Sequence, residues 1–148
     1  MGEAMGGEVE AYYRGQHADE PSVVRTPEDV DALIDALAAG SEFENLAVLH
    51  SLERELLPSG FPDHEFMVGV DGKRQVGVLS FVDEKDFFSL GSSGSRRAEV
   101  VYFVVENPTE FPVTAEIPLA LARQAAKEFL SSGGLRPTCV QWQEPEVW

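Results

Sequence analysis

The chain has 148 residues and a formal net charge of −15 at pH 7, because 26 Asp and Glu residues outnumber 11 Lys and Arg residues. This charge disfavours direct binding to nucleic acid or to an anionic membrane and favours a basic protein partner, unless it serves only to keep molecules apart in solution. The length and a hydrophobic content of 43% predict one globular domain, and the single cysteine, Cys139, excludes an internal disulfide framework and fits a reducing compartment.

We expect no targeting signal at the amino terminus. Residues 1–7 lack the basic region and the apolar run of a secretory signal, and no later segment has the roughly 18 consecutive apolar residues that cross a bilayer. We therefore expect a cytoplasmic protein with a flexible N-terminus over residues 1–8 and a single domain over residues 9–148.

The first predicted elements are a short strand at residues 9–14 and then a helix. Thr26 is a typical N-cap, and Pro27 suits the first helical position, where its missing N–H would be unpaired anyway. The apolar residues that follow at helical spacing are Val30, Leu33, Ile34 and Leu37. Gly40 is expected to end this helix.

The middle of the chain predicts strands. Residues 46–52 fit a strand, although residues 51–57 fit a helix equally well. Apolar residues alternate at 66–70 and again at 76–82, on either side of the turn sequence Asp71-Gly72, which is a β-hairpin signal.

The carboxyl-terminal part predicts a strand, a helix and a closing strand. A flexible turn at residues 91–95 precedes a strand at residues 99–106. A helix is expected to start near Pro118 and to stop at Gly133-Gly134. Its apolar stripe consists of Leu119, Ala122, Ala126, Phe129 and Leu130. Alternation at residues 138–143 predicts the last strand.

These elements predict an α+β fold in a single domain, with a mostly antiparallel sheet of five or six strands and the two main helices packed on one face. Each helix has one apolar stripe, which the sheet must cover. The other face of the sheet would then be partly exposed and available for binding.

Several motifs add a family resemblance. They are Tyr12-Tyr13-Arg14, Thr26-Pro27, Val68–Gly72, Gly77–Ser80, Val101-Tyr102, Glu110-Phe111-Pro112, Ala115–Leu119, Ala125–Leu130, Gly133-Gly134, Arg136-Pro137 and Val140–Gln143. With them the chain resembles the Immunity protein 1 family, small bacterial antitoxins of polymorphic toxin systems, many of which are paired with secreted cytosine deaminases that act on DNA. Residues 41–63 and 83–97 match no part of this pattern, and under the resemblance they would carry the choice of partner.

The resemblance implies an immunity protein that binds a cognate toxin and blocks its active site or substrate groove. The implied toxin is a nucleic-acid cytosine deaminase with a basic groove, which an acidic antitoxin would find quickly. Two alternatives stay open: a small-molecule-binding or regulatory domain with a pocket between sheet and helices, and an acidic DNA mimic that inhibits several nucleic-acid enzymes.

The residues themselves give no sign of catalysis. A zinc deaminase needs a His or Cys beside a Glu, followed by Pro-Cys-x-x-Cys, and this pattern is absent. His17, His50 and His64 lack the His-Glu-x-x-His spacing of a zinc site and are predicted to be surface histidines. Cys139 is predicted to be a small strand residue rather than a nucleophile, because nothing nearby lowers its pKa. We predict no catalytic residue, no metal and no cofactor.

The first candidate partner-binding residues combine negative charge with aromatic side chains. Asp83, Glu84, Asp86, Phe87 and Phe88 are predicted to form a loop that offers a charged rim and an apolar anchor. The alternative is a turn whose two phenylalanines begin the next strand.

The second candidates are Glu106 and Glu110, which flank a predicted turn at Asn107-Pro108-Thr109. The acidic, aromatic tail at residues 144–148 either docks or frays. Internal roles, as a buried indole and as members of an ion pair or helix-end contact, are predicted for Trp142, Arg136 and Glu116.

Overall fold

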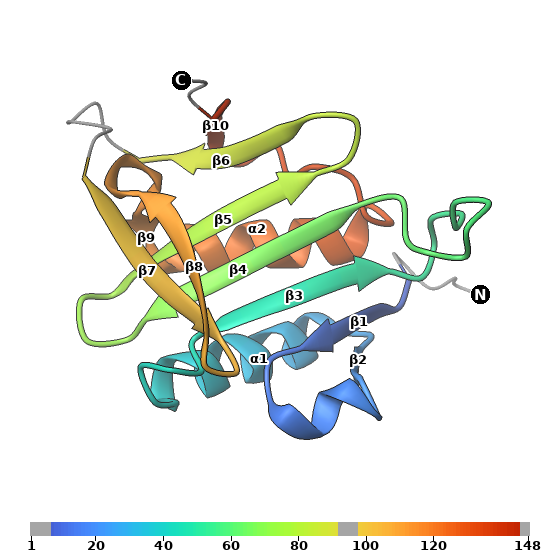
Figure 1. Ribbon diagram of the computed structural model, residues 1–148, viewed down its shortest axis with the longest axis horizontal. Coiled ribbons are helices and arrows are strands. Elements are labelled where there is room, and N and C mark those ends of the chain that lie inside the picture. The colour runs from blue at the N-terminus through green and yellow to red at the C-terminus, as the bar shows by residue number, and fades with distance from the viewer. Residues whose placement is uncertain (1–6, 92–97, 146–148) are drawn as a thin grey trace.

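An antiparallel sheet carries both helices on one face and a two-stranded hairpin on the other (Figure 1). The computed structural model describes residues 7–91 and 98–145. Most of the predicted flexible N-terminus, all but the first residue of the predicted turn at 91–95, and the end of the acidic tail lie outside the described residues. No helix in the described ranges is long and apolar enough to cross a membrane.

The sheet has eight strands in the described part of the chain, and every pairing is antiparallel. Their order is β10-β6-β5-β4-β3-β1-β2, with β9 paired to β5. The bounds are β1 Val9–Tyr12, β2 Ser22–Val24, β3 Leu46–Ser51, β4 Glu65–Asp71, β5 Val76–Val82, β6 Asp86–Leu90, β9 Ile117–Pro118 and β10 Gln141–Gln143. The α+β class is confirmed, but the count exceeds five or six because β2, β9 and β10 have only two or three residues, too few for a periodic pattern.

The two helices, α1 (Pro27–Ala39) and α2 (Leu119–Ser131), begin and end where the sequence predicts. Thr26 Oγ1 accepts a hydrogen bond from the Asp29 N–H at 3.0 Å, and Asp29 Oδ2 accepts one from the Thr26 N–H at 3.2 Å, which makes a capping box. After α2, the glycines at 133–134 take φ angles of +75° and +96°, in the left-handed region that glycine favours.

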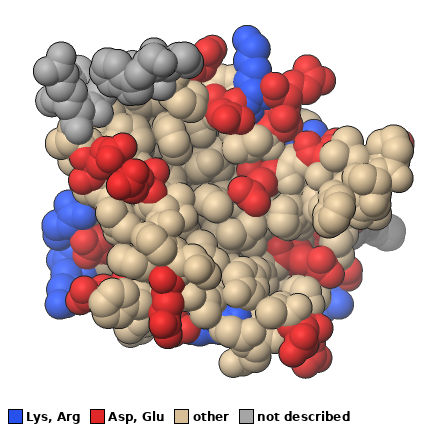
Figure 2. All heavy atoms as spheres, in the orientation of Figure 1, with Lys and Arg blue, Asp and Glu red and all other residues tan. Residues whose placement is uncertain are grey.

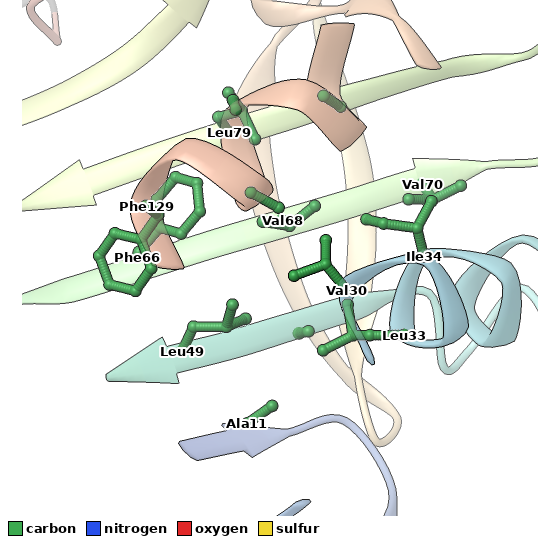
Figure 3. Packing of buried hydrophobic residues seen from close by; sticks show 14 of the residues in the cluster. Ala11, Val30, Leu33, Ile34, Leu49, Phe66, Val68, Val70, Leu79 and Phe129 are labelled. Carbon is green, nitrogen blue, oxygen red and sulfur yellow. The ribbon is translucent and has the colours of Figure 1, made fainter. Parts of the chain in front are cut away.

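The main hydrophobic core lies between the sheet and these helices (Figure 3). Phe129 of α2 stacks on Phe66 of β4 with ring centroids 4.6 Å apart, and Leu33 and Ile34 of α1 project onto the same face. Packing of both helices on one face of the sheet is therefore confirmed.

The hairpin on the other face consists of β7 (Glu99–Val104) and β8 (Asn107–Pro112) and leads into a short 3-10 turn at Val113–Ala115. The predicted strand at 99–106 exists, but it pairs with β8, which was not predicted, and not with the sheet. Proline at positions 108 and 112 obscured β8, because proline cannot donate to a strand ladder and is tolerated at sheet edges.

A second, smaller core joins the hairpin to the sheet. Tyr102 and Phe111 of the hairpin pack with Leu46 of β3 and Val78 of β5, and all four side chains are buried. The exposed sheet face that the sequence predicts is thus covered in part. The hairpin leaves uncovered the end of the sheet where β3 ends and β4 begins (Figure 1).

Two of the predicted strands end earlier in the structure than the sequence predicts. The first strand stops at Tyr12, because the N–H groups of Tyr13 and Arg14 donate to Nδ1 of His17 and leave the ladder. The strand predicted at 46–52 is confirmed as β3, and residues 52–64 form an irregular loop, neither strand nor helix, between β3 and β4.

The predicted closing strand keeps only its last three residues, as β10. The N–H groups of Thr138 and Cys139 donate to the Glu128 carboxylate of α2, at 2.7 and 3.1 Å, and so are not available to a strand. Cys139 therefore lies in a loop and not in a strand. Burial, with the adjacent Glu128, raises the pKa of its thiol to about 11, which is the opposite of what a nucleophile needs.

Candidate partner-binding surface

The turn between β5 and β6 presents three of the predicted carboxylates. Asp83, Glu84 and Asp86 are all exposed, and Asp86 opens β6. Asp83 Oδ1 also accepts hydrogen bonds from the N–H groups of Glu84, at 2.6 Å, and Lys85, at 3.4 Å. Asp83 thus shapes the turn, whereas Glu84 and Asp86 are exposed beside it.

The two predicted aromatic residues are not in a loop. Phe87 and Phe88 belong to β6, where successive side chains point to opposite faces, and both are half-buried. Phe87 lies under the guanidinium of Arg136, 3.9 Å from Cζ to the ring centroid, and Phe88 packs edge-on against Phe111 at 5.5 Å. The alternative placement, a turn whose phenylalanines begin the next strand, is the one observed.

Glu106 and Glu110 are exposed on the hairpin, although its turn is not at Asn107–Thr109. The turn residues are Val105 and Glu106, with φ angles of +46° and +70°, because a two-residue hairpin turn of this kind requires positive φ at both positions. Asn107 already belongs to β8. The N–H of Glu106 donates to the Phe43 carbonyl at 2.8 Å, which ties the hairpin tip to the loop before β3.

The predicted residues therefore form two groups on one side of the molecule. The β5–β6 turn lies at one end of the sheet, and Glu106 lies at the other end, separated by roughly the length of β3, about 17–20 Å. Figure 2 shows acidic side chains spread across this side, with Lys and Arg chiefly at its margins.

Sequence reasoning missed a cluster of exposed apolar side chains beside the β5–β6 turn. In the β3–β4 loop (residues 52–64), the side chains of Leu56, Leu57 and Phe61 are 62%, 47% and 70% exposed. The loop projects beyond the end of the sheet (Figure 1). The sequence did contain a signal for this exposed cluster. Its apolar residues follow neither strand nor helix periodicity and are interrupted by Pro58 and Gly60.

Arg54 connects this loop to its surroundings. Its Nη1 donates to the Gly134 carbonyl at 2.9 Å, and its Nε lies 2.9 Å from Asp63 Oδ1. Its Nη2 lies 4.0 Å from Asp83 Oδ2, so one guanidinium links the β3–β4 loop to the turn after α2 and to the β5–β6 turn. The loop base is consequently fixed to two neighbouring elements.

A hollow of about 530 Å³ lies between the β3–β4 loop and the β5–β6 turn, lined by His50, Leu57, Phe61, Pro62, Asp63, His64, Glu65, Val82 and Asp83. His64 is buried here, so the prediction that it is a surface histidine is wrong. Its Nε2 accepts the Ser51 N–H at 2.8 Å, and its Nδ1 lies 2.9 Å from Asp63 Oδ1. His17 and His50 are half-buried.

Comparison with protein families matches residues 18–144 to the model described as immunity protein Imm1. The chain belongs to the Imm1 immunity protein family. The matched region includes both helices, the hairpin, the β3–β4 loop and the β5–β6 turn. A comparison with curated proteins found no match.

Membership of the Imm1 immunity protein family implies a cognate toxin as partner. Carboxylates and a histidine lie beside the hollow. On the hairpin side of the sheet, Glu10 pairs across from His50, which is also near Glu65. Burial lowers the pKa of His50, and the two carboxylates oppose that shift. The lowered pKa favours the neutral form of His50 beside the two carboxylates.

Of the three motif residues of the Imm1 chain with predicted internal roles, Glu116 makes the predicted ion pair, with Arg74. Trp142 is half-buried and not buried, and Arg136 is exposed, so the internal roles predicted for these two are wrong. Glu116 accepts hydrogen bonds from Arg74 and, at 3.0 Å, from the hydroxyl of Tyr102. Burial and the Glu116 carboxylate raise the pKa of Tyr102. Trp142 is half-buried and donates from Nε1 to the Pro137 carbonyl at 2.8 Å, and Arg136 lies on Phe87. Within the described ranges, no group of His, Cys, Asp and Glu side chains is placed to hold a metal ion.

Proposed function

We propose that this Imm1 protein is a non-enzymatic antitoxin that binds one cognate toxin domain in the cytoplasm and covers its substrate groove. The proposed toxin is a cytosine deaminase that acts on nucleic acid. The resemblance noted in the sequence supports this toxin class, since many Imm1 antitoxins have such partners.

The observation that carries the proposal is the acidic surface. The net charge is −15, and five exposed carboxylates lie in the β7–β8 hairpin or in and beside the β5–β6 turn. They belong to Asp83, Glu84, Asp86, Glu106 and Glu110. A protein that binds nucleic acid must offer positive charge to the phosphates. An acidic antitoxin would be steered toward that charge, which gives the rapid association that neutralisation of a toxin requires.

The proposal is tested by co-expression with the toxin domain encoded beside this chain, followed by co-purification and a deaminase assay on DNA. We expect a one-to-one complex with a nanomolar or lower Kd, on the order of −12 kcal/mol, and loss of deaminase activity at stoichiometric antitoxin. Absence of a complex, or a complex whose toxin stays fully active, would contradict the proposal.

A non-cognate deaminase serves as the control. We expect it to stay active at the same antitoxin concentration, because specific antitoxins recognise more than charge. Inhibition of several unrelated nucleic-acid enzymes would instead favour the DNA-mimic alternative.

A further inference from the structure

Exposed apolar surface is concentrated in the β3–β4 loop. Four of the seven large hydrophobic side chains that are exposed in the described part of the chain lie between Leu52 and Phe61. Phe61 is the most exposed of the seven, at 70%. A cluster of apolar side chains that projects into water contributes nothing to the core, and such clusters typically mark protein interfaces.

The loop is held in one shape although its tip is exposed. The Leu57 N–H donates to the Phe61 carbonyl at 2.8 Å, and the Gly60 N–H closes a turn onto the Leu57 carbonyl, also at 2.8 Å. Leu56 forms a bridge with Pro62, and Arg54 fixes the base through Gly134 and Asp63. A preorganised projection loses little conformational entropy when it binds, which favours high affinity.

Carboxylates surround this apolar projection. Glu55 is in the loop itself, Glu65 and Asp83 line the adjoining hollow, and Glu84 is exposed in the next turn. The complementary partner surface is concave and apolar at its centre, with basic residues around it.

We propose that the β3–β4 loop inserts Phe61 into the substrate groove of the cognate toxin, where the phenyl ring takes the place of a nucleobase and the surrounding carboxylates take the places of phosphates. This inference rests on the proposed function, because it requires a toxin that acts on nucleic acid. A groove that receives a flipped or single-stranded base has apolar or aromatic walls, which suit the phenyl ring, and a basic rim, which suits the carboxylates. Leu56 and Leu57 support the ring as it enters, and exclude water around it.

The test compares Phe61→Ser with a control at another exposed apolar side chain, Leu135→Ser. Leu135 is 61% exposed, follows α2 and lies outside residues 41–63 and 83–97. We expect Phe61→Ser to raise the Kd for the toxin domain by about thirtyfold or more, and Leu135→Ser to change it by less than about threefold. Thermal unfolding of both variants verifies the fold, which Phe61→Ser leaves intact because the ring makes no part of the core.

Two further readouts separate an apolar anchor from a charge effect. The loss of affinity in Phe61→Ser should be the same at low and at high salt, because no charge is removed. A photo-crosslinking amino acid at position 61 should attach to toxin residues that line the substrate pocket, and single-stranded DNA should reduce that crosslink.

The outcomes distinguish the anchor from the function it rests on. The insertion of Phe61 is wrong, and the proposed function stands, if wild-type protein binds and inhibits the toxin but Phe61→Ser does so equally well. The same holds if the crosslink lies away from the substrate pocket. If wild-type protein neither binds nor inhibits the toxin, the proposed function itself fails.

Discussion

His64 is a buried histidine whose two ring nitrogens are both committed. Nε2 accepts the Ser51 N–H, so the ring hydrogen of the neutral form is on Nδ1 and points to Asp63. Protonation would remove the acceptor that Ser51 needs. Burial lowers the pKa of His64, although the hydrogen bond with Asp63 opposes the shift.

This arrangement predicts that the protein loses stability in mild acid. Because the pKa of His64 is lower in the folded than in the unfolded state, the stabilisation is complete above the unfolded value of about 6.5 and is lost as pH falls toward the folded value. His17 and His50 also have lowered pKa values and act in the same direction. One such group adds at most about 1.4 kcal/mol per pH unit to the slope.

Urea unfolding between pH 7.5 and 5.5 measures this slope. His64→Gln, which keeps an acceptor for the Ser51 N–H, should be less stable than wild type at pH 7.5 but should have a shallower slope. His50→Gln is the comparison: it should also make the slope shallower, because the pKa of His50 is lowered too, but it should cost less stability at pH 7.5, because the Ser51 N–H keeps His64 as its acceptor. An unchanged slope in His64→Gln would contradict the role given to His64.

At the scale of elements, the hairpin is joined to the sheet by polar contacts as well as by its small core. Asn45, just before β3, accepts the Phe103 N–H at its Oδ1 at 2.8 Å, and donates its own N–H to the Phe103 carbonyl at 3.1 Å. Its carbonyl accepts the Val70 N–H at 2.9 Å. One residue thus links β7 to β4 without belonging to either strand.

Loss of the Asn45 side chain should weaken the attachment of the hairpin. Asn45→Ala leaves the Phe103 N–H without its acceptor, which is expected to cost about 1–3 kcal/mol in the free energy of unfolding. Asn107→Ala, at an exposed position where the amide donates to Val105 at 3.3 Å, should cost less than about 0.5 kcal/mol. Chemical denaturation measures the free energy of unfolding of both variants. An equal loss in Asn45→Ala and Asn107→Ala would show that the Asn45 side chain does not hold the hairpin to the sheet.

At the scale of the whole molecule, the charge is distributed unevenly enough to orient an encounter. The β3–β4 loop and the β5–β6 turn carry six carboxylates, and Lys and Arg lie chiefly at the margins of this side (Figure 2). The six are Glu53, Glu55, Asp63, Asp83, Glu84 and Asp86. Steering by such a field acts on the association rate more than on the dissociation rate.

Charge reversal at this position should therefore slow association with the toxin. Glu84→Lys with Asp86→Lys is expected to lower kon by about tenfold at low salt, and the difference should shrink as ionic strength approaches 0.15 M, where the Debye length is about 8 Å. Asp83 is left unchanged because it shapes the turn. Stopped-flow association at several salt concentrations provides the measurement.

The control is Asp19→Lys with Glu20→Lys, which changes the net charge equally just before β2, at the opposite edge of the sheet from β6 and β10. Both residues are exposed. Equal slowing by both double variants would mean that net charge, and not the position of the β5–β6 turn, governs association.

The sequence alone determined the elements whose signals are local. The Thr26-Pro27 start, the stripe from Val30 to Leu37, and the glycine pair after α2 act within one or two helical turns, so both helices were placed correctly. The β4–β5 hairpin was also predicted, because its alternation and its turn are adjacent in the chain. The net charge and the motifs that indicate the Imm1 family are likewise properties of the sequence itself.

Tertiary structure decided whatever depends on residues distant in the chain. It buried His64 between Ser51 and Asp63, placed Phe87 under Arg136, and docked a proline-containing β8 on the sheet through β7. It also brought the β3–β4 loop beside the β5–β6 turn, because β3 and β5 end on the same side of an antiparallel sheet. No local sequence pattern predicts that these two segments lie side by side, because their proximity arises from strand pairing between segments about thirty residues apart.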